Sequence, residues 1–172
     1  MAHIGVHALY EIASDVLDEI KQRMLDGGLV ELPERIGLYP GAIAWDACDC
    51  GMLLIAPTRQ YFSENFPFEE VTLTATPCNF PWLVIEYIVQ AIRCAPLPQE
   101  GQLFPSLVEL ESSAKTVIHD SYYLLEGTAK ILCSLKENRE IVDYRITELI
   151  VQGPEGGCVG SELRFSTAIR RG

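Results

Sequence analysis

A change in hydrophobic period divides the second half of the chain and limits the folds that it can adopt. Between Ser106 and Lys136, apolar residues recur every three or four positions, which is the spacing of an amphipathic α-helix. Ser106 and Glu109 have the spacing of a capping box, the reciprocal hydrogen-bonded pair that begins many helices. After Asn138 the apolar residues alternate with polar ones, as in strands that bury one face. The sequence therefore predicts a helix of up to about 30 residues followed by two antiparallel strands.

The long helix is expected to cover a sheet with one set of apolar residues. Gly127 lies among them and predicts a kink or a break in the helix. The two C-terminal strands are expected to be joined by a glycine-rich loop over 153–160. The apolar set is Leu107, Leu110, Ala114, Val117, Ile118, Tyr122, Leu125, Ala129, Leu132 and Leu135.

The first half of the chain predicts one helix and several strands. The helix begins between Ala2 and Tyr10 and ends at Asp26, because Gly27 and Gly28 supply a stop. Pro57 predicts an edge or a bulge in its strand, since proline cannot donate to the ladder. Strands are expected at Gly51–Phe62 and Trp82–Cys94, with shorter extended segments at Arg35–Tyr39, Ala42–Trp45 and Val71–Ala75.

This order of elements predicts an α+β domain, in which an N-terminal helix and one long helix pack on a mostly antiparallel β-sheet that ends in a β-hairpin. A length of 172 residues predicts a single domain spanning 1–172. The apolar runs are too short for a transmembrane helix, so no membrane partner is expected. The N-terminus lacks the basic start of a signal peptide, so we expect synthesis in a cytoplasm.

The chain is acidic, with a formal net charge of −11. Such a chain repels phosphate backbones, so sequence-specific binding of nucleic acid is not expected. The same charge suits the wall of a passage through which nucleic acid slides without sticking. The alternative is that the charge serves only solubility.

The sequence contains no recognisable catalytic or metal-binding constellation. Six cysteines include one close pair, Cys48 and Cys50, but no second pair that would complete a zinc site. All six are expected to be free thiols when the protein is made in a reducing cytosol, with Cys94 and Cys133 as small buried residues. His119 and Asp120 are neighbours on a helix and point apart. We expect no catalytic residue, no metal and no cofactor.

Four aromatic residues, Tyr61, Phe62, Phe66 and Phe68, fall in a segment rich in proline and glutamate. Either this segment packs back over the sheet, or it meets another subunit. The regions 57–80 and 153–160 are expected to be long interface loops. The candidate subunit-interface residues are these four aromatics and Glu155 of the second loop.

Several segments resemble proteins of one viral family. The run PGAIAWDACDCGML at 40–53 resembles a segment of small tail-connector proteins from phages that infect actinobacteria. Phe66-Pro67, Ala91–Pro96 and Gly153–Gly157 are similar in the same order. Together with the order of elements, these segments resemble the tail terminator family over essentially the whole chain.

This resemblance implies a virion structural protein at the tail–head junction. Tail terminators form a hexameric ring that caps the tail tube, halts its polymerisation and docks the DNA-filled head. The implied partners are further copies of the chain, the major tail protein and the head–tail connector proteins, with DNA passing through the lumen. The alternative is a head–tail stopper ring of the same connector. A small-ligand-binding or enzymatic domain is less favoured, because it would need polar groups converging in a pocket.

Overall fold

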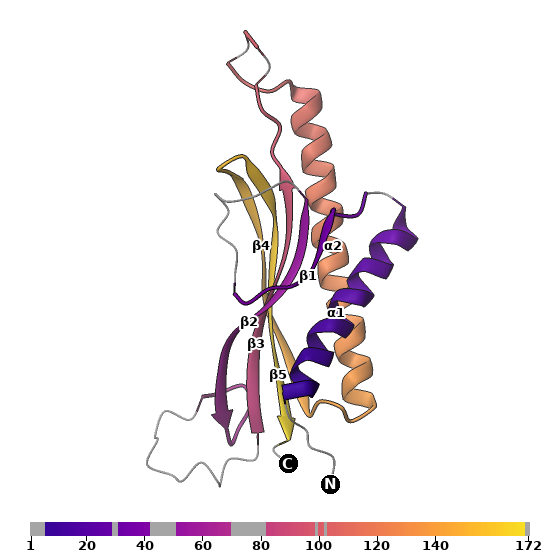
Figure 1. Ribbon diagram of the computed structural model, residues 1–172, viewed down its shortest axis with the longest axis vertical. Coiled ribbons are helices and arrows are strands. Elements are labelled where there is room, and N and C mark those ends of the chain that lie inside the picture. The colour runs from indigo at the N-terminus through magenta and orange to yellow at the C-terminus, as the bar shows by residue number, and fades with distance from the viewer. Residues whose placement is uncertain are drawn as a thin grey trace.

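A computed structural model describes residues 6–28, 31–41, 51–69, 82–98, 100–101 and 103–170. Two helices cover one face of a five-stranded sheet, and no described helix covers the other face (Figure 1). The expected α+β architecture is confirmed. The elements are α1 (Val6–Gly27), β1 (Arg35–Leu38), β2 (Met52–Ser63), β3 (Trp82–Cys94), α2 (Leu107–Glu137), β4 (Asp143–Glu155) and β5 (Cys158–Arg170).

The strands are ordered β1-β2-β3-β5-β4, and every neighbouring pair is antiparallel except β1 and β2. β3 and β5 pair along their full length, from Trp82 opposite Arg170 to Cys94 opposite Cys158. These two long central strands carry most of the apolar residues that face the helices.

The hairpin between β4 and β5 is much tighter than the predicted loop at 153–160. β4 continues to Glu155 and β5 begins at Cys158, so only Gly156 and Gly157 lie between them. Both glycines have positive φ, 57° and 83°, as a two-residue hairpin turn requires. The long loop predicted at this position is therefore wrong.

The loop predicted to begin at residue 57 begins later, because β2 continues past that residue. Residues 57–63 continue the strand and pair with β3, so any loop begins only after Ser63. The register shifts between Pro57 and Arg59, which confirms the bulge predicted at the proline. The predicted segments Ala42–Trp45 and Val71–Ala75 lie outside the described residues, as does the Cys48–Cys50 pair.

The main core lies between the helices and the sheet. Tyr87 of β3 and Phe165 of β5 stack with ring centroids 5.1 Å apart, and the Tyr87 hydroxyl donates to the Leu9 carbonyl of α1 at 3.1 Å. Burial raises the pKa of Tyr87 well above its ordinary value. α1 adds the buried residues Ile12, Ala13, Val16, Leu17, Ile20 and Met24.

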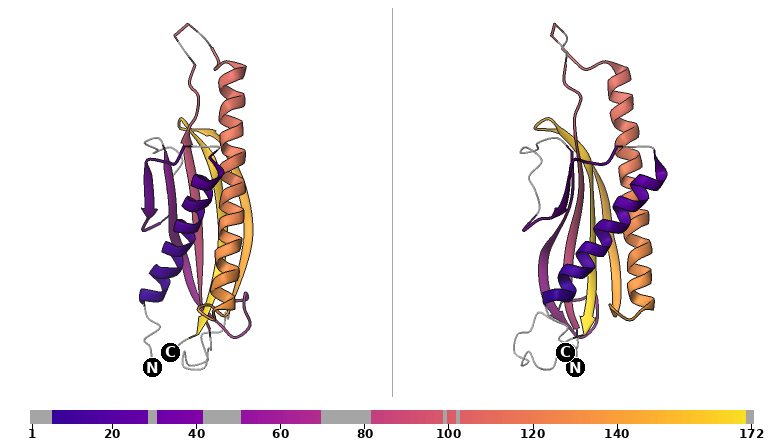
Figure 2. Two further views of the ribbon diagram at one scale, coloured as in Figure 1. Left: turned by 90° about the vertical axis from the view of Figure 1, so that its right-hand side faces the viewer. Right: turned by 45° about the vertical axis from the view of Figure 1, so that its right-hand side comes forward.

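α1 and α2 cross where a glycine allows close approach (Figure 2). A Cβ on Gly127 would lie 3.0 Å from the Cα of Ile20, so any side chain here would press on the α1 backbone. α2 runs without interruption through this position, and the predicted kink or break is wrong. Where α1 ends, the predicted stop is confirmed: the helix finishes at Gly27, and Gly28 has a φ of 58°.

The predicted capping box at the start of α2 is confirmed. The Ser106 hydroxyl accepts from the Glu109 amide at 3.3 Å, and the Glu109 carboxylate accepts from the Ser106 amide at 2.9 Å. The first turns of α2 project past the end of the sheet (Figures 1 and 2). Roughly the first half of the helix therefore has less protein to pack against than the second half.

Candidate functional site

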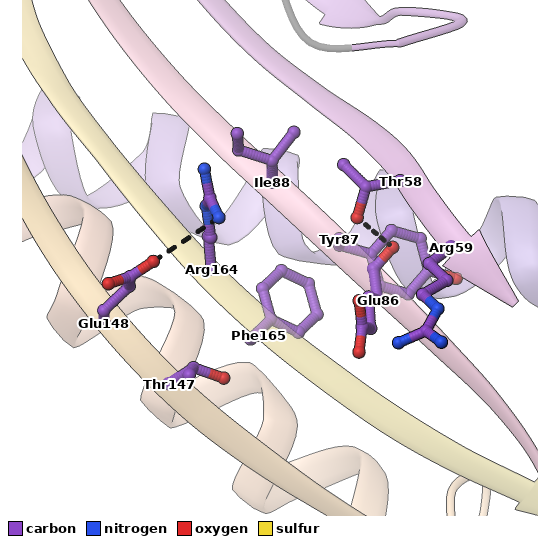
Figure 3. Close-up of a pocket in the computed structure, with 9 residues that line it drawn as sticks. All are labelled: Thr58, Arg59, Glu86, Tyr87, Ile88, Thr147, Glu148, Arg164 and Phe165. Carbon is purple, nitrogen blue, oxygen red and sulfur yellow. Dashed lines mark hydrogen bonds and ion pairs between the residues drawn. The ribbon is translucent and has the colours of Figure 1, made fainter. Parts of the chain in front are cut away.

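The helix-free face of the sheet carries a shallow depression of about 410 Å³ (Figure 3). Figure 3 shows Arg164 of β5 and Glu148 of β4 reaching toward each other across it, with a distance of 3.5 Å between nitrogen and oxygen. The lining residues are Thr58, Arg59, Glu86, Tyr87, Ile88, Thr147, Glu148, Arg164 and Phe165.

The charges around this depression are tied into a network across three strands. The buried Glu162 carboxylate accepts from Arg164 Nε at 2.8 Å and from Gln90 Nε2 at 3.1 Å. The Thr58 hydroxyl donates to the Glu86 carbonyl at 3.2 Å rather than to a side-chain base. This arrangement holds β3, β5 and β4 together, and it does not activate a nucleophile.

The four candidate aromatics form a corner at the far end of β2, which we call the aromatic corner (Tyr61, Phe62, Phe66 and Phe68). The Tyr61 hydroxyl donates to the Pro67 carbonyl at 2.8 Å, and the Ser63 hydroxyl donates to the Phe68 carbonyl at 2.6 Å. These bonds fold the chain after β2 back onto the strand. The peptide bond between Phe66 and Pro67 is cis.

Only one of the four aromatics is largely exposed. Phe68 is 69% exposed, whereas Tyr61, Phe62 and Phe66 are half-buried. The Arg59 guanidinium lies 5.2 Å from the centre of the Tyr61 ring and pairs with Glu69. Burial raises the pKa of Tyr61. The described part of this segment packs back on the sheet, and Phe68 alone of the four aromatics presents a largely exposed side chain, so contact with another subunit stays a prediction.

Glu155 lies far from the aromatic corner. It is exposed at the β4–β5 turn, where it stands opposite Cys158, at the end of the sheet where β2 begins. The aromatic corner lies where β2 ends. The structure therefore does not bring the five candidate interface residues together.

α2 exposes an apolar surface that the sequence analysis assigned to the core. Val117, Leu132 and Leu135 of the predicted set are buried, but others are not. We call the exposed row the α2 stripe (Leu107, Ala114, Ile118, Tyr122 and Leu125). Its large members are 83%, 64%, 58% and 41% exposed, in chain order.

The stripe was missed because the apolar residues of α2 follow two faces. Val117 points to the core, whereas Ile118, the next residue, lies about 100° further round the helix and is exposed. The predicted apolar set covers more of the helix circumference than one core-facing stripe does. This excess was the signal in the sequence for a second apolar face. Leu110 is 38% exposed, so its assignment to the core is also wrong.

The described part of the sheet has two open edges. β4 is the last strand in the order, and among the described strands only β1 pairs with β2 on its other side, from Met52 to Ile55. Open edges present unpaired N–H and C=O groups. α1 packs over β1 and β2, whereas α2 packs over β3, β5 and β4. The molecule thus has an α1/β2 flank and an α2/β4 flank.

The cysteines differ from the prediction of six free thiols. Cys94 and Cys158 lie opposite each other on β3 and β5, and both are disulfide-bonded. Cys133 is free but exposed rather than buried, with its Sγ 2.8 Å from the Tyr144 hydroxyl. This contact and burial raise the pKa of Tyr144.

His119 and Asp120 point apart, as predicted. Asp120 is fully buried and accepts two bonds from the Arg93 guanidinium, at 2.7 and 2.9 Å. This bidentate pair joins α2 to the end of β3 and leaves the carboxylate no role as a partner for His119.

Within the described ranges, no three His, Cys, Asp or Glu side chains are placed to share a metal ion. Nor is any helix there long and apolar enough to span a membrane.

Comparison with known proteins finds no family model that matches the chain and no curated protein that matches it.

Proposed function

We propose that this protein is a ring-forming virion component that caps the phage tail tube and joins it to the head connector. The observation that carries the proposal is that the described part of the sheet ends in different strands on its two flanks, β4 on one and β1 with β2 on the other. When two unlike flanks bind each other, subunits associate head to tail, and such contacts close into a ring when the rotation permits.

The shape and charge of the chain agree with this role. The helices cover one face of the sheet, while the helix-free face carries paired charges and no catalytic constellation among the residues described. A net charge of −11 disfavours tight contact with DNA, which suits a ring that lets DNA pass. The segments that resemble the tail terminator family point to the same role.

Purified protein added to tubes of the major tail protein tests the proposal. Electron microscopy should show a ring on one end of each tube, and capped tubes should not grow when more tail protein is added. Protein that binds isolated head connectors but never tubes would identify a head–tail stopper instead. Protein that binds neither would contradict both assignments.

Phe68→Ala tests the one exposed aromatic of the predicted interface. Because Phe68 is 69% exposed, its loss should leave the melting temperature nearly unchanged. We expect the variant to cap fewer tubes than the wild type at equal concentration. Equal capping would remove the aromatic corner from the interface without contradicting the ring itself.

A further inference from the structure

We infer that the α2 stripe is a self-association surface, buried against a second copy of this chain. The inference rests on the proposed ring, since it assigns one side of the contact between neighbouring subunits. It adds a surface that is separate from the aromatic corner and from the β4–β5 turn.

The first argument is the exposed area. Leu103 and Phe104, just before α2, are 88% and 77% exposed and extend the stripe at its projecting end. Together, these residues and the stripe expose on the order of 800 Å², which is the area that one partner buries in a standard protein interface. An apolar patch of this size exceeds the largest patch of a typical monomer.

The second argument is the spacing of the stripe. Leu107, Glu111, Ala114 and Ile118 are separated by four, three and four residues, and the same spacing repeats through Tyr122, Leu125 and Ala129. This 11-residue period stays on one side of an almost straight helix. The alanines leave room for a neighbouring backbone to approach closely. This side of the helix is therefore apolar from Ala114 to Ala129, while between Leu107 and Ala114 it carries the exposed Glu111, which pairs with Lys115.

The third argument is an exposed apolar residue at the edge of β4, on the face that α2 covers. Ser121 of α2 and Ser161 of β5 have hydroxyl oxygens 2.5 Å apart, so Ser161 faces α2. Val151 of β4 stands opposite Ser161 on the same side of the sheet and is 58% exposed. The α2/β4 flank thus carries exposed apolar side chains on both the helix and the edge strand.

A second copy supplies a matching surface on its α1/β2 flank. That flank includes α1, which carries two exposed apolar residues, Tyr10 and Leu25, at 58% and 52% exposure. A head-to-tail neighbour sets this flank against the stripe and the β4 edge, and both apolar surfaces are then removed from water.

Sedimentation of the purified protein over a range of concentrations tests the inference. Ile118→Arg places a charge in the centre of the stripe and should weaken association by about tenfold or more. Ser112→Arg is the matched control, because Ser112 is exposed on another side of the same helix. Circular dichroism melts should show both variants folded, since Ile118 is 64% exposed.

A photoreactive phenylalanine analogue at position 118 provides a second readout on protein bound to tail tubes. A crosslink to another copy of this chain supports the inference even when free protein is monomeric. Where the wild type self-associates in solution, equal association of Ile118→Arg overturns the inference, and a crosslink only to the tail protein overturns it in every case. Monomeric wild type with no crosslink to itself also overturns it. Self-association through position 118 without tube capping would contradict only the proposed function.

Discussion

Gly127 sets the distance between the two helices, and Gly127→Ala should destabilise the protein. Alanine favours an isolated helix by about 1 kcal/mol over glycine. At this position, however, a Cβ would meet the Cα of Ile20 at 3.0 Å, so α1 would have to move. We expect a net loss of about 1–3 kcal/mol in the free energy of unfolding, measured by urea denaturation. Ser112→Ala, on an exposed side of α2, should change it by less than about 0.5 kcal/mol.

A Gly127→Ala variant as stable as the wild type would show that α1 shifts at no cost.

The sequence could not reveal this crossing, because a glycine inside a helix predicts a kink equally well. Leu110 and Val117 illustrate the same limit. Both fit a helical apolar pattern, yet Val117 is 3% exposed and Leu110 is 38% exposed. Which face meets the sheet depends on tertiary packing that a single pattern does not encode.

At the scale of elements, a cluster of charges joins α1 to α2. The Glu19 carboxylate accepts from Arg23 at 2.8 Å and from Lys130 at 2.9 Å. These bonds lower the pKa of Glu19 below its ordinary value of 4.5. A carboxyl group with a lowered folded-state pKa stabilises the protein above its ordinary pKa, and this stability is lost as the pH falls through the folded-state value.

Glu19→Gln should therefore destabilise the protein in a pH-dependent manner. We expect a loss of about 0.5–1 kcal/mol at neutral pH, as is typical of partly exposed ion pairs. The melting temperatures of variant and wild type should converge as the pH falls below the ordinary pKa of glutamate. A constant difference at all pH values would mean that the amide changes packing rather than charge.

Asp15→Asn should have the opposite effect. Burial, together with the charges of Glu140, Glu11 and Asp18, raises the pKa of Asp15 above its ordinary value of 3.8. The ionised form is then a cost to the folded state, which grows as the pH rises through the folded-state pKa. We expect the variant to melt at a higher temperature than the wild type at pH 7 and at the same temperature at low pH. A lower melting temperature at pH 7 would show that the carboxylate makes a favourable contact.

Local signals predicted the elements that depend on local chemistry. The capping box at Ser106, the glycine stop after α1 and the full extent of β3 were all predicted correctly. β2 (Met52–Ser63) also agrees with the predicted Gly51–Phe62 within one residue at each end. The facing ends of β4 and β5 were not predicted, because glycine and proline there favour a loop. In the structure, Gly156-Gly157 form a two-residue turn, and pairing between β4 and β5 extends both strands.

At the scale of the whole molecule, Cys94 and Cys158 are both disulfide-bonded, which makes a chemical prediction. In protein purified without reductant and then denatured, iodoacetamide should modify Cys133 and spare Cys94 and Cys158. Reduction before labelling should make both of them reactive. Peptide mapping of the unreduced protein would identify the partner of each cysteine. Modification of Cys94 or Cys158 without reduction would contradict the disulfide bonding.

The two flanks of the subunit make different predictions for head-to-tail and two-fold assembly. Ile118→Arg damages the α2/β4 flank, whereas Phe68→Arg charges the loop that follows β2 on the α1/β2 flank; both side chains are exposed. In a head-to-tail ring, every contact joins one flank to the other, so neither variant alone should assemble. In a mixture, the intact α2/β4 flank of Phe68→Arg can bind the intact α1/β2 flank of Ile118→Arg. Sedimentation should therefore show dimers but no rings. If the stripes instead pair with each other about a two-fold axis, Phe68→Arg will associate like the wild type and mixing will rescue nothing.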